Sequence, residues 1–124
     1  MEKATFKDLI ARKMQKDNDK IKFYEIPVKS MGKSLIFKKP SDDLRLDMLD
    51  ELGTSPTTRQ LMNMYKKLIY LTCDLMQDSE LHEQIGVKDP FDTVDAIFNL
   101  DDIVDIGEQL MDAIEPPVEE IKNS

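Results

Sequence analysis

The chain has 124 residues, of which 40% are hydrophobic and 34% are charged, and its formal net charge is −8 at pH 7. This length is typical of one domain with one core, so two domains are not expected. Because proteins that bind nucleic acid by neutralising phosphates are normally basic, the acidic composition argues against nucleic acid as a partner.

The charges are divided unevenly along the chain. Residues 1–40 hold 11 Lys and Arg against 5 Asp and Glu, a net charge of +6, whereas residues 41–124 hold 6 against 20, a net charge of −14. Such a division indicates two surfaces with different roles, or the basic end of one chain meeting the acidic end of another.

A helix is predicted at the start of the chain. Thr5 can cap it, with Asp8 three positions later in an arrangement like a capping box. The apolar residues of this segment recur at helical spacing: Phe6, Leu9, Ile10 and Met14.

Two strands are predicted next, joined by a turn. Side chains alternate from Ile21 to Val28 and again over residues 34–38, with many β-branched and aromatic residues. Gly32 between them supplies the positive φ that a turn needs. Pro27 cannot donate to a strand ladder, so we expect it at a sheet edge or a strand end. Because an isolated hairpin is marginally stable in water, this one is expected to pack on a helix or on another subunit's strands.

About five helices are predicted after the hairpin. The residues expected to cap them are, in chain order, Ser41, Ser55, Ser79, Asp89 and Asp101. The second helix is the longest, over residues 56–77, and is expected to be central. Gly107 lies inside the last helix, where it costs up to about 1 kcal/mol relative to Ala. A close helix crossing or a tolerated defect would each explain it. Ile114 is expected on the inner face of that helix.

Together these elements predict an α+β fold, mostly α, with an N-terminal helix and a β-hairpin followed by a helical bundle. We expect a single domain over residues 1–114, made of a basic helix plus hairpin (residues 1–40) and an acidic helical body (residues 41–114). Residues 115–124, which begin with Glu115-Pro116-Pro117, are expected to form a flexible tail.

Nothing in the sequence indicates catalysis, a cofactor or a metal. Cys73 and His82 are the single cysteine and histidine, so the chain can form no internal disulfide and no zinc site. Cys73 is expected in the core, and His82 on a solvated helix face. The acidic residues from Asp92 to Asp105 lack the spacing of a calcium loop and are interpreted as helix caps and solvated surface. No phosphate loop, dinucleotide fingerprint or nucleophile elbow is present, so we predict a protein that is not an enzyme.

The first residues do not resemble a targeting segment. Residues 1–7 have no apolar signal-peptide core, and no apolar run in the chain approaches the ~18 residues that a membrane-spanning helix needs. We therefore expect no membrane partner and a reducing cytoplasm as the place of action.

The hairpin is the candidate partner-binding surface. Lysines surround its aromatic residues, and such a mixture can bind single-stranded nucleic acid by stacking. Lysines also protect an exposed hairpin from edge-to-edge aggregation, and we favour this interpretation, or a protein contact, over nucleic acid. Met31 at the tip is the methionine most expected to be exposed. The residues predicted to bind a partner are Phe23, Tyr24, Ile26, Met31, Leu35, Phe37, Lys38 and Lys39.

Four stretches carry a family resemblance: Ile21-Lys22-Phe23-Tyr24-Glu25-Ile26-Pro27, Ser34-Leu35-Ile36-Phe37-Lys38-Lys39-Pro40, Met64-Tyr65-Lys66-Lys67-Leu68-Ile69-Tyr70-Leu71 and Asp89-Pro90-Phe91-Asp92-Thr93-Val94. With the acidic capped helix that starts at Ser41, their order resembles the small tail assembly chaperones of long-tailed phages and defective prophages of Gram-positive bacteria, the XkdN-like group. The resemblance covers roughly residues 12–114.

The resemblance implies a non-catalytic role in building the tail in the host cytoplasm. Such chaperones look after the tape measure protein, a very long helical chain that would aggregate alone. They present it to tail tube subunits and are absent from the finished particle. Members often exist in a short form and a longer, frameshifted form, and they tend to self-associate. We therefore predict a homo-oligomer held through the hairpin or through the basic and acidic regions.

Two other functions remain open at this stage. A structural adaptor or connector retained in the phage particle would be present there in stoichiometric copies. An acidic regulatory module that sequesters a basic protein would lose binding at moderate salt, because surface charges are screened beyond ~8–10 Å.

Overall fold

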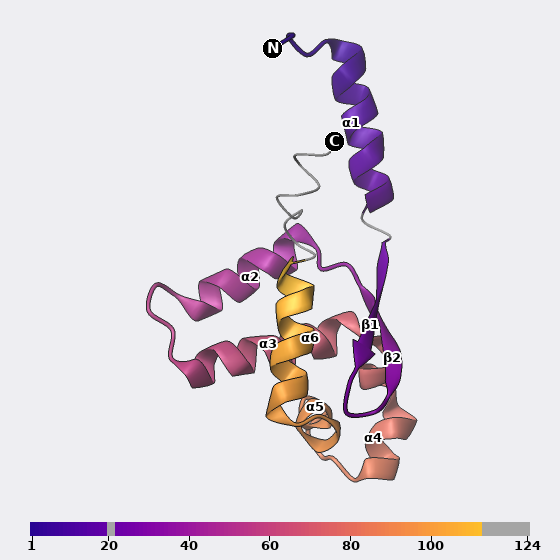
Figure 1. Cartoon of the computed structure of the whole chain (residues 1–124), viewed down its shortest axis with the longest axis vertical. Helices are drawn as coiled ribbons and strands as arrows, with labels where there is room; N and C mark the ends of the chain where they lie inside the picture. The colour runs from indigo at the N-terminus through magenta and orange to yellow at the C-terminus, as the bar shows by residue number, and fades with distance from the viewer. Residues whose placement is uncertain (20–21, 113–124) are drawn as a thin grey trace.

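The computed structural model describes residues 1–19 and 22–112 (Figure 1). Its elements are, in chain order, α1 (Phe6–Asp19), β1 (Phe23–Val28), β2 (Lys33–Lys38), α2 (Asp42–Leu52), α3 (Thr58–Thr72), the 3₁₀ helix η1 (Asp74–Gln77), α4 (Ser79–Ile85), α5 (Asp92–Ile97) and α6 (Leu100–Asp112). The predicted α+β architecture, mostly α, is confirmed. The predictions for Ile21, Ile114 and the tail over residues 115–124 lie outside the described residues.

The hairpin packs one face against the helices. β1 and β2 are antiparallel, with Tyr24 opposite Phe37 and Ile26 opposite Leu35. This face is apolar and lies over α3 and α6, where Val28 and Phe37 are fully buried. Gly32 has a φ of 64°, as the turn requires. The hairpin is therefore stabilised by helices of its own chain. Packing on a helix was the first of the two alternatives expected from the sequence.

Pro27 lies in β1 at a position that loses no ladder bond. The backbone N–H of Lys39 donates to the carbonyl of Lys22 (2.9 Å), and hydrogen-bonded pairs alternate along an antiparallel ladder from that point. Pro27 stands opposite Ser34, five pairs beyond the bonded pair of Lys22 and Lys39. An odd number of pairs gives a non-bonded pair, so the Pro27 nitrogen faces away from β2. Among the described residues the sheet has only these two strands, and the expectation of an edge position is confirmed.

The centre of the body is the crossing of α3 and α6. Leu68 and Ile69 of α3 and Ile106 and Leu110 of α6 are fully buried. The crossing is close because Gly107 faces Tyr65: a Cβ atom at position 107 would lie 2.4 Å from Cγ of the Tyr65 ring. The glycine that weakens the helix locally is therefore explained by packing, which decides between the two sequence-based interpretations.

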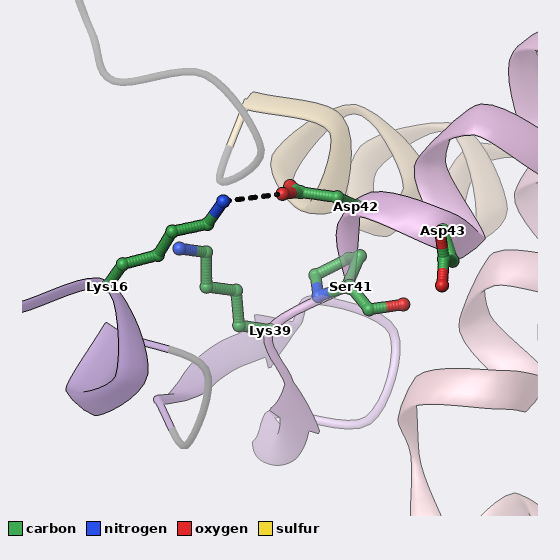
Figure 2. Close-up of a pocket in the computed structure, with 6 residues that line it drawn as sticks. Lys16, Lys39, Ser41, Asp42 and Asp43 are labelled. Carbon is green, nitrogen blue, oxygen red and sulfur yellow. Dashed lines mark ion pairs between the residues drawn. The ribbon is translucent and has the colours of Figure 1, made fainter. Parts of the chain in front are cut away.

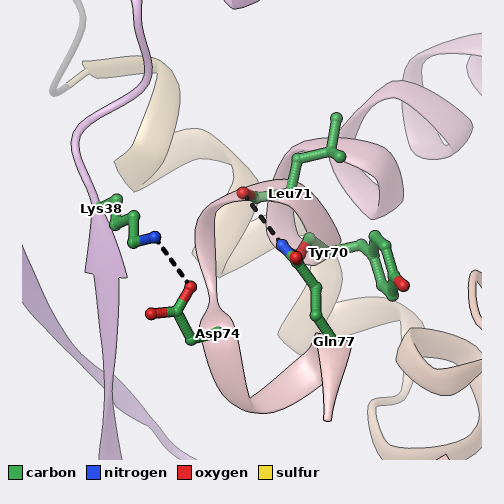
Figure 3. A network of polar contacts seen from close by, with 5 residues as sticks. All are labelled: Lys38, Tyr70, Leu71, Asp74 and Gln77. Carbon is green, nitrogen blue, oxygen red and sulfur yellow. Dashed lines mark hydrogen bonds and ion pairs between the residues drawn. The ribbon is translucent and has the colours of Figure 1, made fainter. Parts of the chain in front are cut away.

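The predicted continuous helix over residues 56–77 is wrong. α3 ends at Thr72, whose hydroxyl donates to the carbonyl of Leu68 (2.6 Å), and η1 follows after Cys73. The side-chain amide of Gln77 turns back and donates to the carbonyls of Tyr70 (3.0 Å) and Leu71 (3.3 Å) at the end of α3 (Figure 3). Those carbonyls lose their partners where the helix stops, so Gln77 acts as a C-terminal cap.

Three predicted N-caps are displaced by one or two residues. α3 is capped by Thr57 rather than Ser55, and Gln60 completes a capping box. α4 is capped by Asp78 rather than Ser79. Before α6 the Asn99 side chain accepts a hydrogen bond from the backbone N–H of Asp102 (2.9 Å), so Asn99 takes the place expected of Asp101. In each case a neighbouring polar residue offers the same local chemistry, so the sequence alone does not fix which of them is the cap.

The other two predicted caps have different outcomes. Ser41 caps α2 as predicted, because its hydroxyl accepts from the backbone N–H of Leu44 (3.1 Å). Asp89 accepts from the N–H of Phe91 (3.0 Å) in the turn that precedes α5, whose first residue is Asp92. Asp89 thus shapes the approach to α5 rather than capping it.

Candidate functional site

α1 presents an apolar face that the described part of the chain leaves uncovered. The exposed fractions are 81% for Phe6, 63% for Leu9, 49% for Ile10 and 62% for Met14, and no residue of α1 is buried. Figure 1 shows α1 standing beyond the end of the hairpin where β1 begins, away from the helical body. The predicted helix is confirmed, but its apolar stripe contributes nothing to the core.

α1 is nonetheless a well-started helix. The backbone N–H of Thr5 donates to the Asp8 carboxylate (2.9 Å), and the Thr5 hydroxyl accepts from the backbone N–H of Asp8 (3.2 Å). The Thr5 backbone N–H and then its hydroxyl (3.0 Å) donate to the Asp8 carboxylate, and these two bonds hold the pKa of Asp8 below its ordinary value. The Lys13 ammonium pairs with Asp17 one turn later (2.6 Å). The local signals therefore specify a helix whose apolar face the described body does not cover.

The end of α1 and the start of α2 line a hollow of about 440 Å³. Its lining includes Lys16, Lys39, Ser41, Asp42 and Asp43, and Lys16 pairs with Asp42 at 3.7 Å (Figure 2). Both partners of this pair are largely exposed, so the pair contributes at most about 1 kcal/mol. Two ammonium groups line one side of the hollow and two carboxylates the other, so its formal charges balance (Figure 2).

An apolar groove lies at the other end of the molecule, beside the hairpin tip. Apolar side chains from the hairpin, η1, α4 and the α5 segment line it: Met31, Leu35, Leu75, Met76, Leu81, Ile97 and Phe98. Its volume is about 360 Å³, which is within the range of about 300–1,000 Å³ of binding pockets. Asp78 and Glu80 supply the charged part of the lining, and over residues 1–19 and 22–112 no basic side chain lines the groove. We refer to these residues as the acidic-rimmed groove.

The hairpin tip is fixed to the body beside this groove. The Ser30 hydroxyl donates to Oδ2 of Asp102 (2.8 Å), and the same oxygen accepts from the backbone N–H of Asn99 (3.2 Å). Asp102 is only 7% exposed, so the interpretation of this residue as solvated surface is wrong. Its carboxylate joins the start of α6 to the turn and so holds Met31 at the mouth of the groove.

The eight predicted partner-binding residues are divided by the structure into three sets. Phe23 (61%) and Met31 (46%) are exposed, and Tyr24, Leu35 and Lys39 are half-buried. Lys38 is exposed and pairs with Asp74 of η1 at 2.9 Å (Figure 3). Ile26 and Phe37 belong to the core, at 4% and 0%, so in this conformation their side chains offer no surface to a partner.

Met31 and Leu35 are the predicted residues that the structure brings into the groove. Their companions Leu75, Leu81 and Ile97 were missed, because they come from three other elements and their apolar spacing resembles that of core residues. Phe23 and Lys38 line a neighbouring hollow that shares Leu35 and Leu75 with the groove. Ile26 and Phe37 are buried, so the predicted set is only partly a surface.

The single cysteine and the single histidine, which could carry chemistry, both pack against other residues of the fold. Cys73 is buried, as predicted, and burial raises the pKa of its thiol. His82 is half-buried rather than solvated: a ring nitrogen contacts the Met76 carbonyl, and the ring stacks on Tyr70 at a centroid distance of 6.3 Å. Over residues 1–19 and 22–112 no cluster of three or more His, Cys, Asp or Glu could hold a metal ion. In the same ranges, none of the helices has the length and apolarity needed to cross a bilayer.

Comparison with known proteins adds no relative to this description. A scan of the chain against models of protein families found no match, and searches of curated proteins and of solved structures found none either. The resemblance to tail assembly chaperones therefore stays a prediction that rests on the residues quoted above.

Proposed function

We propose that this protein is a non-catalytic phage tail assembly chaperone that binds the tape measure protein, keeps it soluble and helps recruit tail tube subunits in the host cytoplasm. The acidic-rimmed groove is the observation that carries the proposal. A long helical client exposes apolar faces before it is assembled, and a groove lined by adaptable Met and Leu side chains fits such a face.

The remaining surface suits a protein that must stay dispersed while holding an apolar client. The chain carries a net charge of −8, and most of its acidic residues lie after residue 40, around and beyond the groove. A net charge of this size supports solubility in a small domain. The acidic rim in turn favours client segments whose apolar stripe is flanked by Lys or Arg.

Co-expression with a phage tape measure protein tests the proposal. We expect the wild-type chain to raise the soluble fraction of the client several-fold. Leu75→Gln alters a groove residue that is 57% exposed and should lose most of this gain. Leu46→Gln alters a residue of α2 outside the groove that is 58% exposed and should keep it. No gain with the wild-type chain would contradict the proposal.

Mass spectrometry of purified particles separates this function from that of a retained adaptor. A chaperone is expected in infected cells and missing from finished particles. Stoichiometric copies in the particles would overturn the chaperone proposal in favour of the adaptor.

A further inference from the structure

We propose that the acidic-rimmed groove also receives α1 of a second copy of this chain, so that the protein associates with itself through a helix laid in a groove. Both halves of such an interface are present in each copy. One is the uncovered apolar face of α1, and the other is the groove beside the hairpin tip. The role of this contact in displacing a client rests on the function proposed above.

The spacing on α1 is that of a groove-binding helix. Phe6, Leu9, Ile10 and Met14 are separated by three, four and eight positions from the first, which places them on one face. Amphipathic helices that bind in grooves use anchors at this spacing. All four are about half-exposed or more, so the face is available at once and needs no local unfolding.

Charge selects the groove as the place where this face docks. At 100° per residue, Lys7 flanks the apolar face of α1 on one side and Lys16 flanks it on the other, and the Lys13–Asp17 pair lies on the face itself, beyond Ile10 along the helix. In the part of the chain that the structure describes, the groove offers Asp78 and Glu80 and no basic side chain. Docking therefore brings opposite charges together at the rim while apolar side chains are covered at the centre.

Position favours a second copy over the chain's own α1. Figure 1 shows α1 beyond the β1 end of the hairpin, whereas the turn and α4 lie at the opposite end. The six-residue strands between these ends span about 20 Å. α1 is also directed away from the body, so its apolar face is presented to other molecules.

The proposed contact also regulates client binding. If α1 and a client helix bind the same groove, a free chaperone covers its own apolar surface by self-association, and the client releases the copies from one another. If two copies each place α1 in the other's groove, they form a closed two-fold dimer. If each copy docks α1 on the next copy only, the association extends into a chain of copies.

Cross-linking between two differently tagged variants tests the contact. One carries Ile10→Cys on α1 and the other carries Met31→Cys at the groove, and the native Cys73 is buried at 1% exposure. Mild oxidation of the mixture should give a covalent heterodimer. Replacing Met31→Cys by Leu46→Cys, on α2 outside the groove, should not. Absence of the heterodimer would overturn the proposal, as would a chain carrying both cysteines that cross-links only within itself.

Sedimentation of the full chain provides the second measurement. We expect concentration-dependent association that high salt weakens, because charges at the rim are screened. Leu9→Gln should weaken association about tenfold or more, and Leu46→Gln should leave it unchanged. A monomer at every concentration and salt would overturn the proposal. Self-association that persists in a chain unable to hold the tape measure protein would remove the proposed function alone.

Discussion

α1 and α3 are both amphipathic helices with a Thr capping box or a close equivalent, yet they differ completely in what covers their apolar faces. α3 buries Met64, Tyr65, Leu68 and Ile69 in the core, whereas α1 buries nothing. An apolar stripe at helical spacing indicates that a helix packs against an apolar partner, because an uncovered stripe leaves its side chains in water, which is unfavourable. It does not indicate which molecule supplies the partner, and that difference separates the structural part of this chain from its interacting part.

The largest expected contrast comes from one aromatic residue in each region. Phe37→Ala removes a fully buried ring beneath the hairpin and should lower the free energy of unfolding by about 3–5 kcal/mol. Phe6→Ala removes a ring that is 81% exposed and should change it by less than about 0.5 kcal/mol. Urea unfolding followed by circular dichroism, at a concentration where the chain is monomeric, measures both. Equal losses would mean that α1 belongs to the core.

The helix crossing gives the next effect. Gly107→Ala places a Cβ atom against the Tyr65 ring, so α3 and α6 must separate, and the cost of overpacking outweighs the gain in helix propensity. We expect a loss of about 1–3 kcal/mol in the same unfolding experiment. Glu108→Ala, on the exposed side of α6, is the control and should change stability by less than about 0.5 kcal/mol. An unchanged midpoint for the alanine at position 107 would show that the crossing can relax.

These elements also show how far sequence carries the fold. The alternation in β1 and β2, the cap at Ser41 and the apolar spacing of the body helices are local signals, and they yield the correct order of elements. The break after Thr72 has no glycine or proline to mark it. It depends on Gln77 reaching back to the α3 carbonyls, a contact made only once the chain has turned.

The groove was harder to predict than the hairpin that borders it. Met31 was identified because a methionine at a turn is expected to be exposed. Leu75, Leu81 and Ile97 come from η1, α4 and α5, and only the packing of these short helices brings them to one wall. For α1 the difficulty was the opposite. Its helical spacing was plain, but nothing in the sequence indicated that its apolar face would stay uncovered.

A smaller effect is expected where the hairpin tip is tied to α6. Asp102→Ala removes the acceptor of the Ser30 hydroxyl and of the Asn99 backbone N–H, and should cost about 1–2 kcal/mol in stability. Ser30→Ala leaves the cap of α6 in place and should cost less than half as much. Thermal unfolding of the two variants measures the difference. Equal losses would assign the whole effect to the turn rather than to the helix start.

The smallest effects come from the paired caps, and they compare the two helices directly. Thr57→Ala removes the cap of α3 and should lower the free energy of unfolding by about 1 kcal/mol, because α3 unfolds with the core. Thr5→Ala removes the cap of α1, a 14-residue helix that is marginal in isolation, so it should shorten α1 and leave global unfolding unchanged. Amide hydrogen exchange resolves this local loss.

pH should reproduce the effect of Thr5→Ala without a mutation. The pKa of Asp8 in the helix lies below its ordinary value of 3.8, because Thr5 donates to the carboxylate. The carboxylate therefore supports α1 fully above that ordinary value, and the support is lost as the pH falls through the lowered pKa. The protection factors of the α1 amides from Leu9 onward, which are corrected for the intrinsic pH dependence of exchange, should fall over this acidic range in the wild-type chain and much less in Thr5→Ala. If α1 lies in another copy's groove, raising the protein concentration should slow the same amides, since docking then holds the helix that its cap alone cannot.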